Sequence, residues 1–225
     1  PRNITETTGA HEKYPAWSPD GKSIAYFSDA SGEYEIHIKP QDGKGDAKTF
    51  QLNGTGFYAY PEWSPDSKQI CYVDNGRNLY LLNVETGNSV KIDSDELYIP
   101  GPFREIFSDW SFDSKWVDYS KVSETNFKRI FLYSVEQGKS YAITDGLSDA
   151  SEPIFDKSGK YLYFFASTDA GPVVNWFDQS NADMEMTYSI YLATLQKDLI
   201  SPFAKENDEE EIKKEEEKKD DKDKK

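Results

Sequence analysis

Apolar and polar residues alternate along short stretches of the chain, which is the pattern of half-buried β-strands. In the stretch that follows Gly21, Ile24 and Tyr26 face one side of the predicted strand and Ala25 faces the other. The pattern returns three times, so the apolar positions form two columns. These columns are Ile24, Ile70, Val117 and Leu162, and Tyr26, Tyr72, Tyr119 and Phe164. This patterning predicts an all-β fold built from copies of one unit.

Each alternating stretch follows a repeated turn sequence, which reads Pro-Ala-Trp-Ser-Pro-Asp-Gly-Lys in its first copy. An aromatic residue marks every copy, with spacings of 46, 47 and 45 residues. These residues are Trp17, Trp63, Trp110 and Phe155. The period is typical of propeller blades, which are roughly 40–50 residues long. Pro19 presets φ in a tight turn, and Asp20 can hydrogen-bond the backbone of that turn.

A third strand is predicted in every copy, and a short fourth strand in three copies after a turn that carries glycine. The third strands are expected at 35–38, 78–81, 129–132 and 189–192, and the fourth at 48–52, 89–92 and 140–143. Four antiparallel strands per repeat make a propeller blade. We therefore predict a partial β-propeller of about four blades of four antiparallel strands. The blades are expected at 14–52, 61–93, 108–144 and 153–203.

The two ends of the chain differ from the repeats. Residues 1–7 are predicted to form the outer strand of a preceding blade, because Asn3-Ile4-Thr5 parallels the outer strand at 142–144. Four blades fall short of closing a ring, so residues 1–205 are expected to be an arc of a larger propeller. Residues 206–225 alternate acidic and lysine blocks and cannot bury enough apolar surface to fold alone. They are interpreted as a linker or tail.

The repeated Trp-Ser-Pro-Asp-Gly units resemble the PD40 or TolB-like propeller repeat, which occurs in several unrelated proteins. The stretch 190–210, which begins Ile190-Tyr191-Leu192, is similar to the end of the second, seven-bladed-type propeller of tricorn-type proteases, and so is the stretch 14–35. In that family the propellers precede a PDZ domain and an α/β catalytic region with a Ser/His nucleophilic site. The resemblance implies that the catalytic residues lie beyond residue 225.

The resemblance implies a function without catalysis in this chain. It would be the propeller portion of a tricorn-like serine protease, a hydrolase, and would gate or scaffold the access of oligopeptides to the catalytic domain. Its partners would be the downstream PDZ and catalytic domains and a peptide substrate or product, with a homo-oligomer as a further option. A TolB-like interaction propeller and the propeller of a prolyl-oligopeptidase-type hydrolase are the alternatives. The family implies a cytoplasmic location, and a periplasmic or exported one is the alternative.

The composition limits the class of partner. The formal net charge is −15, and an acidic surface repels phosphate backbones, so neither nucleic acid nor a membrane is expected as a partner. No run of about 18 apolar residues exists that could span a bilayer. The chain opens at Pro1 without an initiator Met, which suggests an excised segment or a processed chain.

The chain shows no motif for catalysis, a cofactor or a metal. No Gly-x-Ser-x-Gly elbow, P-loop or dinucleotide fingerprint occurs. His37 shares a strand column with aromatic residues and is expected to pack there, whereas His11 is expected to be a solvated loop residue. Cys71 takes the position of Ala25 and is interpreted as a small buried hydrophobe. The aspartate repeated from Asp20 onward suits turn stabilisation better than calcium, which needs six or more oxygens.

Two insertions are the candidate contact surfaces. The loop at 168–186 contains aromatic and methionine residues that often form such surfaces, and a lid packed on its own propeller is the alternative. The residues are Trp176, Phe177, Met184 and Met186. The insertion at 93–107 carries Arg104, which could donate two hydrogen bonds to a peptide carboxylate or form a surface salt bridge.

Overall fold

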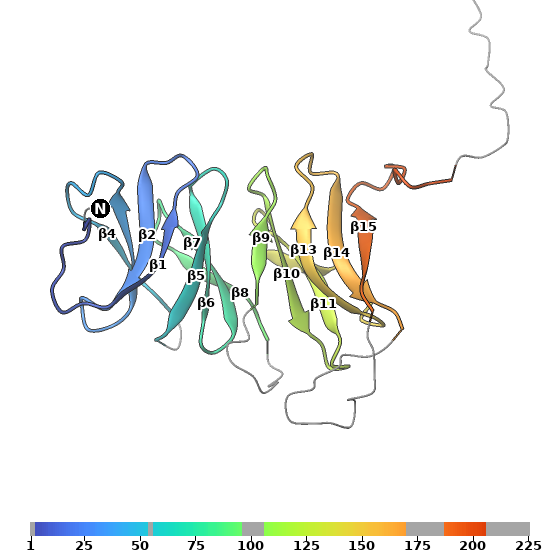
Figure 1. The fold of residues 1–225 in the computed structure, drawn as a ribbon, viewed down its shortest axis with the longest axis horizontal. Helices are drawn as coiled ribbons and strands as arrows, with labels where there is room; N and C mark the ends of the chain where they lie inside the picture. The colour runs from blue at the N-terminus through green and yellow to red at the C-terminus, as the bar shows by residue number, and fades with distance from the viewer. Residues whose placement is uncertain (1–2, 54–55, 96–105, 170–186, 206–225) are drawn as a thin grey trace, which may run out of the picture.

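The computed structural model describes residues 3–53, 56–95, 106–169 and 187–205, which form an all-β arc (Figure 1). These residues contain fifteen β-strands. Within the described ranges, no helix is long and apolar enough to span a membrane. The strands form four antiparallel sheets, and within each sheet every strand pairs with the next one along the chain. The sheets follow one another along the arc in chain order, so the predicted all-β partial propeller is confirmed.

Each sheet is one blade. Blade 1 contains β1 (Glu12–Trp17), β2 (Ser23–Ser28), β3 (Glu35–Pro40) and β4 (Lys48–Gln51). Blade 2 contains β5 (Tyr58–Trp63), β6 (Gln69–Asp74), β7 (Asn78–Asn83) and β8 (Ser89–Ser94). Blade 3 contains β9 (Ser108–Trp110), β10 (Trp116–Val122), β11 (Lys128–Ser134) and β12 (Lys139–Ala142). Blade 4 contains β13 (Asp149–Phe155), β14 (Tyr161–Ser167) and β15 (Ser189–Thr194).

A fourth strand is predicted only for blades 1 to 3, and blade 4 has three strands, so it departs from the general four-stranded unit. In blades 1 to 3 a glycine with positive φ turns the chain into the fourth strand. These glycines are Gly43, Gly87 and Gly138, with φ values of 69°, 77° and 61°. The sequence after β15 has no glycine at this place, and residues 195–204 form bends and turns instead. The missing turn residue is the physical reason for the missing strand.

The N-terminal segment forms no strand in its described part, residues 3–11. Instead, the Asn3 side-chain oxygen accepts hydrogen bonds from the backbone N–H groups of Thr5 and Glu6, both at 3.1 Å. A strand needs a neighbouring strand to pair with, and the sheet of blade 1 has β1 as its first strand, so no described strand pairs with residues 3–11. The outer strand of a preceding blade at 1–7 therefore stays a prediction.

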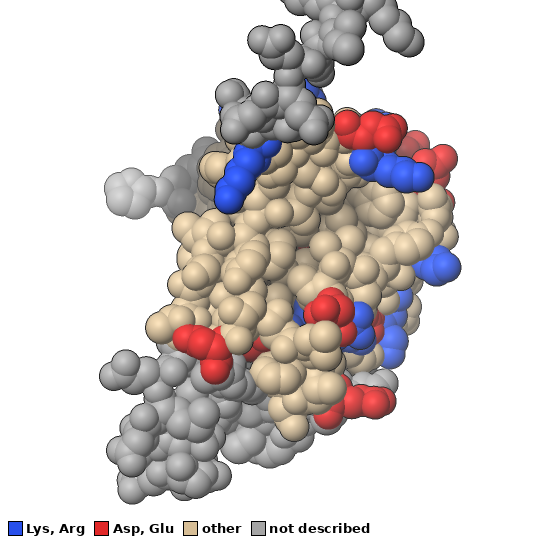
Figure 2. All heavy atoms as spheres, turned by 90° about the vertical axis from the view of Figure 1, so that its right-hand side faces the viewer, with Lys and Arg blue, Asp and Glu red and all other residues tan. Residues whose placement is uncertain are grey.

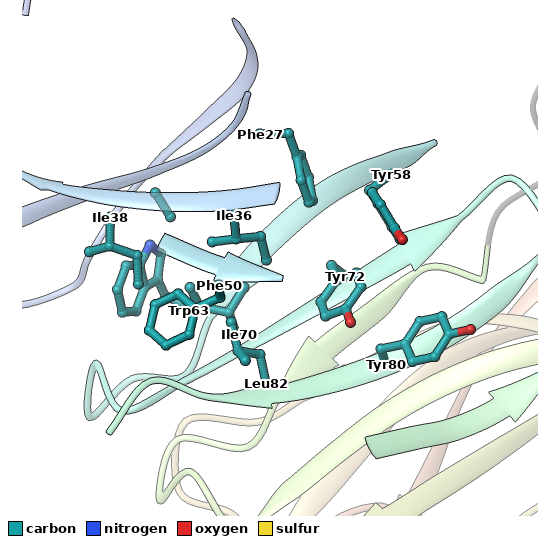
Figure 3. Close-up of a cluster of buried hydrophobic side chains, with 11 residues drawn as sticks. Phe27, Ile36, Ile38, Phe50, Tyr58, Trp63, Ile70, Tyr72, Tyr80 and Leu82 are labelled. Carbon is teal, nitrogen blue, oxygen red and sulfur yellow. The ribbon is translucent and has the colours of Figure 1, made fainter. Parts of the chain in front are cut away.

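Face-to-face packing of neighbouring blades makes the hydrophobic core. Between blades 1 and 2, Phe27 and Ile36 of one sheet meet Ile70 and Tyr72 of the next, and all four are completely buried (Figure 3). Each buried side chain of this size contributes about 1.5–3 kcal/mol to stability. Similar clusters join blade 2 to blade 3 and blade 3 to blade 4. A blade between two others therefore packs both of its faces.

The turn after each first strand has the predicted chemistry. In blade 1 the N–H of Gly21 donates to the carbonyl oxygen of Ser18 at 2.8 Å, with Pro19 at the second turn position. The Asp20 carboxylate accepts from the Ser18 hydroxyl at 2.7 Å and from the N–H of Lys22 at 3.0 Å. The equivalent bonds are made by Asp66 and Asp113. The prediction that these aspartates stabilise turns is confirmed.

Two hydrogen bonds join blades 1 and 2 beside these turns. The indole N–H of Trp63 donates to the carbonyl oxygen of Ala16 at 3.2 Å, and the N–H of Asp20 donates to the Ser67 hydroxyl at 3.1 Å. At the next junction, the same pair of bonds joins Trp110 to Glu62 at 3.4 Å and Asp66 to Ser114 at 3.0 Å. The repeated tryptophan therefore connects blades as well as filling the core.

The junction of blades 3 and 4 lacks both bonds. Blade 4 has Phe155 and Gly159 where blades 2 and 3 have tryptophan and serine, so it has neither the indole donor nor the hydroxyl acceptor. A cavity of about 620 Å³ opens at this junction, and Phe112, Trp116 and Phe155 are among the residues that line it.

Ser67 and Ser114 occupy a turn position with φ values of 61° and 60°, where blades 1 and 4 have glycine. A left-handed residue other than glycine costs about 1 kcal/mol or more. Both hydroxyl groups accept the inter-blade hydrogen bond, which a glycine could not do. This bond gives the physical reason for serine at these positions.

We expect Ser114→Ala to destabilise the chain by about 1–2 kcal/mol, because it leaves the N–H of Asp66 without its acceptor while keeping the backbone strain. Ser114→Gly should be less destabilising than Ser114→Ala, because glycine removes that strain. Urea unfolding followed by tryptophan fluorescence measures both variants. Equal stability of Ser114→Ala and the wild type would contradict the role of the hydroxyl group.

Candidate functional site

The first strands of the blades form the inner edge of the arc, which we define as β1, β5, β9 and β13. β1 contacts β5, and β9 contacts β13. The indole bond from Trp110 of β9 to the Glu62 carbonyl of β5 connects the remaining pair. Side chains that project from this edge therefore come from successive blades and lie in a row.

Three of these four strands contain a β-bulge with a strained residue before a proline. The residues are Tyr14, Tyr60 and Glu152, with φ values of 54°, 52° and 53°. Non-glycine residues in this region cost of order 1–3 kcal/mol, and bulges often redirect a side chain beside a functional site. In blade 3, Phe107 just before β9 and Ser108 of β9 stand in place of the Tyr-Pro pair, and β9 pairs with β10 in continuous register. The strain is therefore a repeated feature of the inner edge.

Tyr14, Tyr60 and Phe107 take the same place in three successive blades and form what we call the aromatic row. The ring centroids of Tyr14 and Tyr60 are 5.1 Å apart, and those of Tyr60 and Phe107 are 6.1 Å apart. The three side chains are 37%, 44% and 67% exposed. Their rings lie at tilted angles within contact distance, so together they offer a continuous aromatic surface.

A lysine lies at the blade 1 end of the aromatic row. Lys13 Nζ is 4.0 Å from the ring centroid of Tyr34, and it also lies over the rings of Tyr14 and Phe57 at 5.7 and 5.5 Å. Partial burial lowers the pKa of Lys13. The inner edge therefore already holds one cation on aromatic rings, which is an attractive cation–π arrangement.

Carboxyl groups lie at the other end of the row, between blades 2 and 3. Glu62 and Asp109 come two residues after Tyr60 and Phe107, at the position where blades 1 and 4 have Ala16 and Ile154. A carboxylate oxygen of Glu62 accepts a hydrogen bond from the Ser108 hydroxyl at 3.4 Å. Burial, and then the charge of Asp109, raise the pKa of Glu62 to about 8.

A third carboxyl group lies behind this pair. Asp118 of β10 is directly opposite Asp109 in the ladder and is only 1% exposed. One of its oxygens accepts from the N–H of Asp109 at 3.1 Å, and the other has no hydrogen-bond partner. Burial, followed by the charges of Asp109 and Glu62, raises the pKa of Asp118 to about 9. We call Glu62, Asp109 and Asp118 the carboxyl cluster.

A hollow of about 620 Å³ opens beside the carboxyl cluster. Its carboxylates are Glu62, Asp66, Asp109 and Asp113, and its aromatic residues are Trp63, Trp110 and Phe112. The two indole N–H groups are already bonded to carbonyl oxygens of the preceding blade. The lining therefore presents mainly acceptors and ring carbons. Within the described parts of the chain, no three His, Cys, Asp or Glu residues are arranged to hold a metal ion.

The residues singled out from the sequence have different outcomes. The predicted contact residues Arg104, Trp176, Phe177, Met184 and Met186 lie outside the described residues, so their role stays a prediction. Three other residues can be placed. Cys71 is completely buried, as predicted, and burial raises the pKa of its thiol well above the usual range.

The two histidines each contact an aromatic ring of blade 1. His37 packs against the Tyr26 ring with centroids 5.5 Å apart, as predicted, and its Nε2 is 3.5 Å from a Glu35 oxygen. The exposed His11 is not simply solvated, because its Nδ1 lies 2.6 Å from the Tyr34 hydroxyl. Both histidines are therefore part of local side-chain contacts.

Sequence reasoning missed the aromatic row and the carboxyl cluster. The signal was present as a departure from the repeat columns, because Asp118 stands where the other copies have Ala25, Cys71 and Tyr163. Period-2 patterning assigns such a position to the buried face but does not show what surrounds it. Only the packing of blade 3 beside blade 2 brings Glu62 to Asp109.

The outer face of blade 4, which we call the end face, is an exposed apolar surface. It contains Ile154, Phe165 and Ile190, which are 55%, 39% and 70% exposed. Figure 2 views the molecule from this end and shows a broad uncharged area with charged groups mostly at its margin. The positions equivalent to Ile190 are Ile36, Leu79 and Ile130, and all are completely buried. Exposed apolar faces of this kind mark contact surfaces.

We expect the wild-type chain to self-associate at about 100 µM through the end face, and Ile190→Lys to shift it toward the monomer, because the lysine charge would have to be buried in the contact. Sedimentation velocity measures the change. Val90→Lys, at a 47% exposed position of blade 2, is the matched control and should not alter association. A wild-type chain that is fully monomeric at this concentration would contradict the prediction.

Rising pH should destabilise the chain between about pH 5 and 8. Unfolded Glu62 and Asp118 lose their protons near 4.5 and 3.8, whereas the folded forms keep them up to about 8 and 9. The folded state thus binds more protons in this range, and each carboxyl adds a slope of up to about −1.4 kcal/mol per pH unit to the free energy of unfolding. Urea unfolding at several pH values measures the slope.

Glu62→Gln keeps the shape of the protonated acid and should remove the part of this slope that Glu62 causes. Glu85→Gln, at an exposed position of blade 2, is the matched control and should leave the slope unchanged. If the free energy of unfolding has the same pH slope in Glu62→Gln and the wild type, the pKa of Glu62 is not raised in the folded chain.

The fold and the inner edge define this chain as a segment of a β-propeller, with antiparallel blades around an edge that carries exposed aromatic and partly buried acidic side chains. The sequence profile described as "Tricorn protease second beta propeller domain" matches residues 1–225. The chain therefore belongs to the family of tricorn protease second β-propeller domains, and the resemblance drawn from its repeats is confirmed.

Solved structures of a tricorn protease and an oligogalacturonate lyase share this fold. The crystal structure of the tricorn protease matches with a TM-score of 0.67 and 18% identity, over 85% of this chain and 18% of that one. An oligogalacturonate lyase from Vibrio parahaemolyticus matches with a TM-score of 0.50 and 16% identity, over 71% and 46% of the two chains. TolB from Acinetobacter baumannii has a TM-score of 0.45 and 22% identity, over 70% and 40%. This chain thus spans less than a fifth of the tricorn protease. No curated protein sequence matches it.

Proposed function

We propose that this chain is the peptide-guiding propeller segment of a tricorn-like serine protease, a hydrolase whose catalytic and PDZ domains lie outside it. It contacts oligopeptide substrates or products on their way to or from the catalytic domain. Membership in the tricorn propeller family supports the parent class. The observation that carries the guiding role is the aromatic row on the inner edge.

The aromatic row suits an extended peptide for two reasons. Its three rings are exposed, and they are contributed by three successive blades, so they offer contacts spaced along one surface. Aromatic surface binds peptide side chains and backbone with little sequence preference, as a guide for many oligopeptides requires. The strained φ of Tyr14 and Tyr60 indicates that these rings are held in place by the bulge rather than by local preference.

The end face supports the proposed architecture. In blades 1 to 3 the equivalent face packs on the following blade, so the end face of blade 4 fits a further blade of the same kind. The parent protein would provide it, either in the same chain or from a second copy in a homo-oligomer. We infer a cytoplasmic location from the family, and imaging of the tagged full-length protein would check it.

In the full-length protease, we expect Tyr60→Ala to raise KM about three- to tenfold for peptides of about ten residues, because one aromatic contact is worth about 0.5–1.5 kcal/mol. Cleavage of a dipeptide reporter substrate should not change, because such a substrate reaches the catalytic domain without needing the row. Steady-state kinetics with both substrates measures the difference. Phe203→Ala, at a position 76% exposed outside the strands, is the matched control.

Equal effects of Tyr60→Ala on both substrates would indicate a general structural defect rather than guidance. No effect on either substrate would contradict the guiding role. A full-length reading frame that stops after the propeller would favour the TolB-like interaction propeller. A full-length reading frame with a Gly-x-Ser-x-Gly elbow after the propeller would instead favour the prolyl-oligopeptidase-type alternative.

A further inference from the structure

The carboxyl cluster brings three acidic side chains together at the inner edge. Four strands contribute the groups that interact here, which are Glu62 of β5, Cys71 of β6, Asp109 of β9 and Asp118 of β10. Asp66 and Asp113 of the adjoining turns also line the hollow, and they are paired with Lys68 and Lys115 at 4.0 Å. The described lining of the hollow contains no lysine, arginine or histidine. The fold does not require the cluster, because the equivalent inner-edge positions in blades 1 and 4 are Ala16 and Ile154.

One buried carboxyl oxygen of the cluster has no hydrogen-bond partner. It belongs to Asp118, which is 1% exposed. Buried polar atoms in native proteins are nearly always paired, so this oxygen calls for an explanation. The Asp118 carboxyl group interacts electrostatically with Asp109 and Glu62. The cluster therefore has an unmet hydrogen bond and no basic side chain in the described lining of the hollow beside it.

The hollow beside the cluster has walls that match a flat cation. The rings of Trp63, Trp110 and Phe112 line it, and the Phe112 side chain is 62% exposed. Pro19 and Pro65 complete the apolar part of the lining. A volume of about 620 Å³ lies within the range of small-ligand sites. Aromatic faces and carboxylates together attract cations by cation–π and ionic contacts.

We propose that this hollow binds the guanidinium group of an arginine side chain in a peptide, with Glu62 and Asp109 as acceptors and the aromatic wall of Trp63, Trp110 and Phe112 around it. A guanidinium group has five N–H donors and no acceptor, which complements a lining of acceptors and ring carbon. A bare metal ion fits less well, because no group of three ligand-type residues in the described ranges has a metal-binding arrangement.

This inference deepens the proposed function and rests on it, because it takes a peptide as the ligand of the inner edge. Tyr60 and Phe107 of the aromatic row come immediately before Pro61-Glu62 and Ser108-Asp109 in β5 and at β9. A peptide on the row can therefore place one side chain at the carboxyl cluster. The site would select, among oligopeptides, those with an arginine at the matching position.

The test uses the whole 225-residue chain and two capped pentapeptides, alanine-rich with a central arginine or a central citrulline. Citrulline has nearly the same shape without the charge. Isothermal calorimetry gives the affinity, and the indole N–H signals of Trp63 and Trp110 in NMR spectra locate the site. We expect the arginine peptide to bind at least tenfold more tightly than the citrulline peptide, and both indole signals to shift.

Glu62→Gln should lower the affinity for the arginine peptide at least tenfold, since it removes one charge-assisted acceptor without changing the side-chain shape. Glu85→Gln, far along the outer part of blade 2, should bind like the wild type. The arginine peptide should also bind more tightly as pH rises from about 6 to 8, with release of protons, because it displaces protons from the cluster while its own charge does not change.

Each other outcome overturns the inference. If the arginine and citrulline peptides bind with equal affinity, the inner edge binds peptides without distinguishing their charge. That result would reject the guanidinium site and leave the proposed function unaffected. If Glu62→Gln binds the arginine peptide like the wild type, the cation binds elsewhere. If no binding is detected up to about 10 mM, the site does not exist, and the kinetics of Tyr60→Ala still decides the guiding role independently.

Discussion

The burial of one sheet face against the next is the interaction on which this structure depends. A four-stranded blade has two faces and no interior of its own, so its apolar columns leave water only when a neighbour stands beside it. Ile36, Leu79 and Ile130 are completely buried for this reason, and Ile190 of blade 4 is not. The turn unit serves the same constraint, because its tryptophan and serine side chains bond to the preceding blade. The junction of blades 3 and 4, where both residues are replaced, contains a cavity.

The inner edge shows features that this packing does not require. The strained residues before proline and the carboxyl cluster both reduce stability near neutral pH, and the repeat itself offers alternatives at several of these positions. Natural sequences depart from local consistency mainly at functional sites. The inner edge is therefore the part of the molecule where recognition is expected. On the faces between blades, packing determines which residue type occupies each position.

Membership in the tricorn second-propeller family fits this division of roles. A propeller provides a rigid frame, and function on such a frame resides in the side chains that it exposes rather than in the fold itself. In this chain the inner edge carries exposed aromatic side chains and, beside them, partly buried acidic ones. A guide for peptides needs surface of the first kind, and selectivity among peptides needs charge of the second kind.

The amino-acid sequence alone determined the repeat, the order and place of most strands, the turn role of the aspartates and the burial of Cys71. These features follow from local periodicity and turn chemistry, which a repeated sequence displays four times. The absent fourth strand of blade 4 was also readable, since the glycine of its turn is missing. The tertiary structure alone decided which residues of different blades meet. Glu62 and Asp109 are 47 positions apart, and Tyr14, Tyr60 and Phe107 come from three successive blades. Their contacts depend on how closely one blade stacks on the next, and no local pattern encodes that distance.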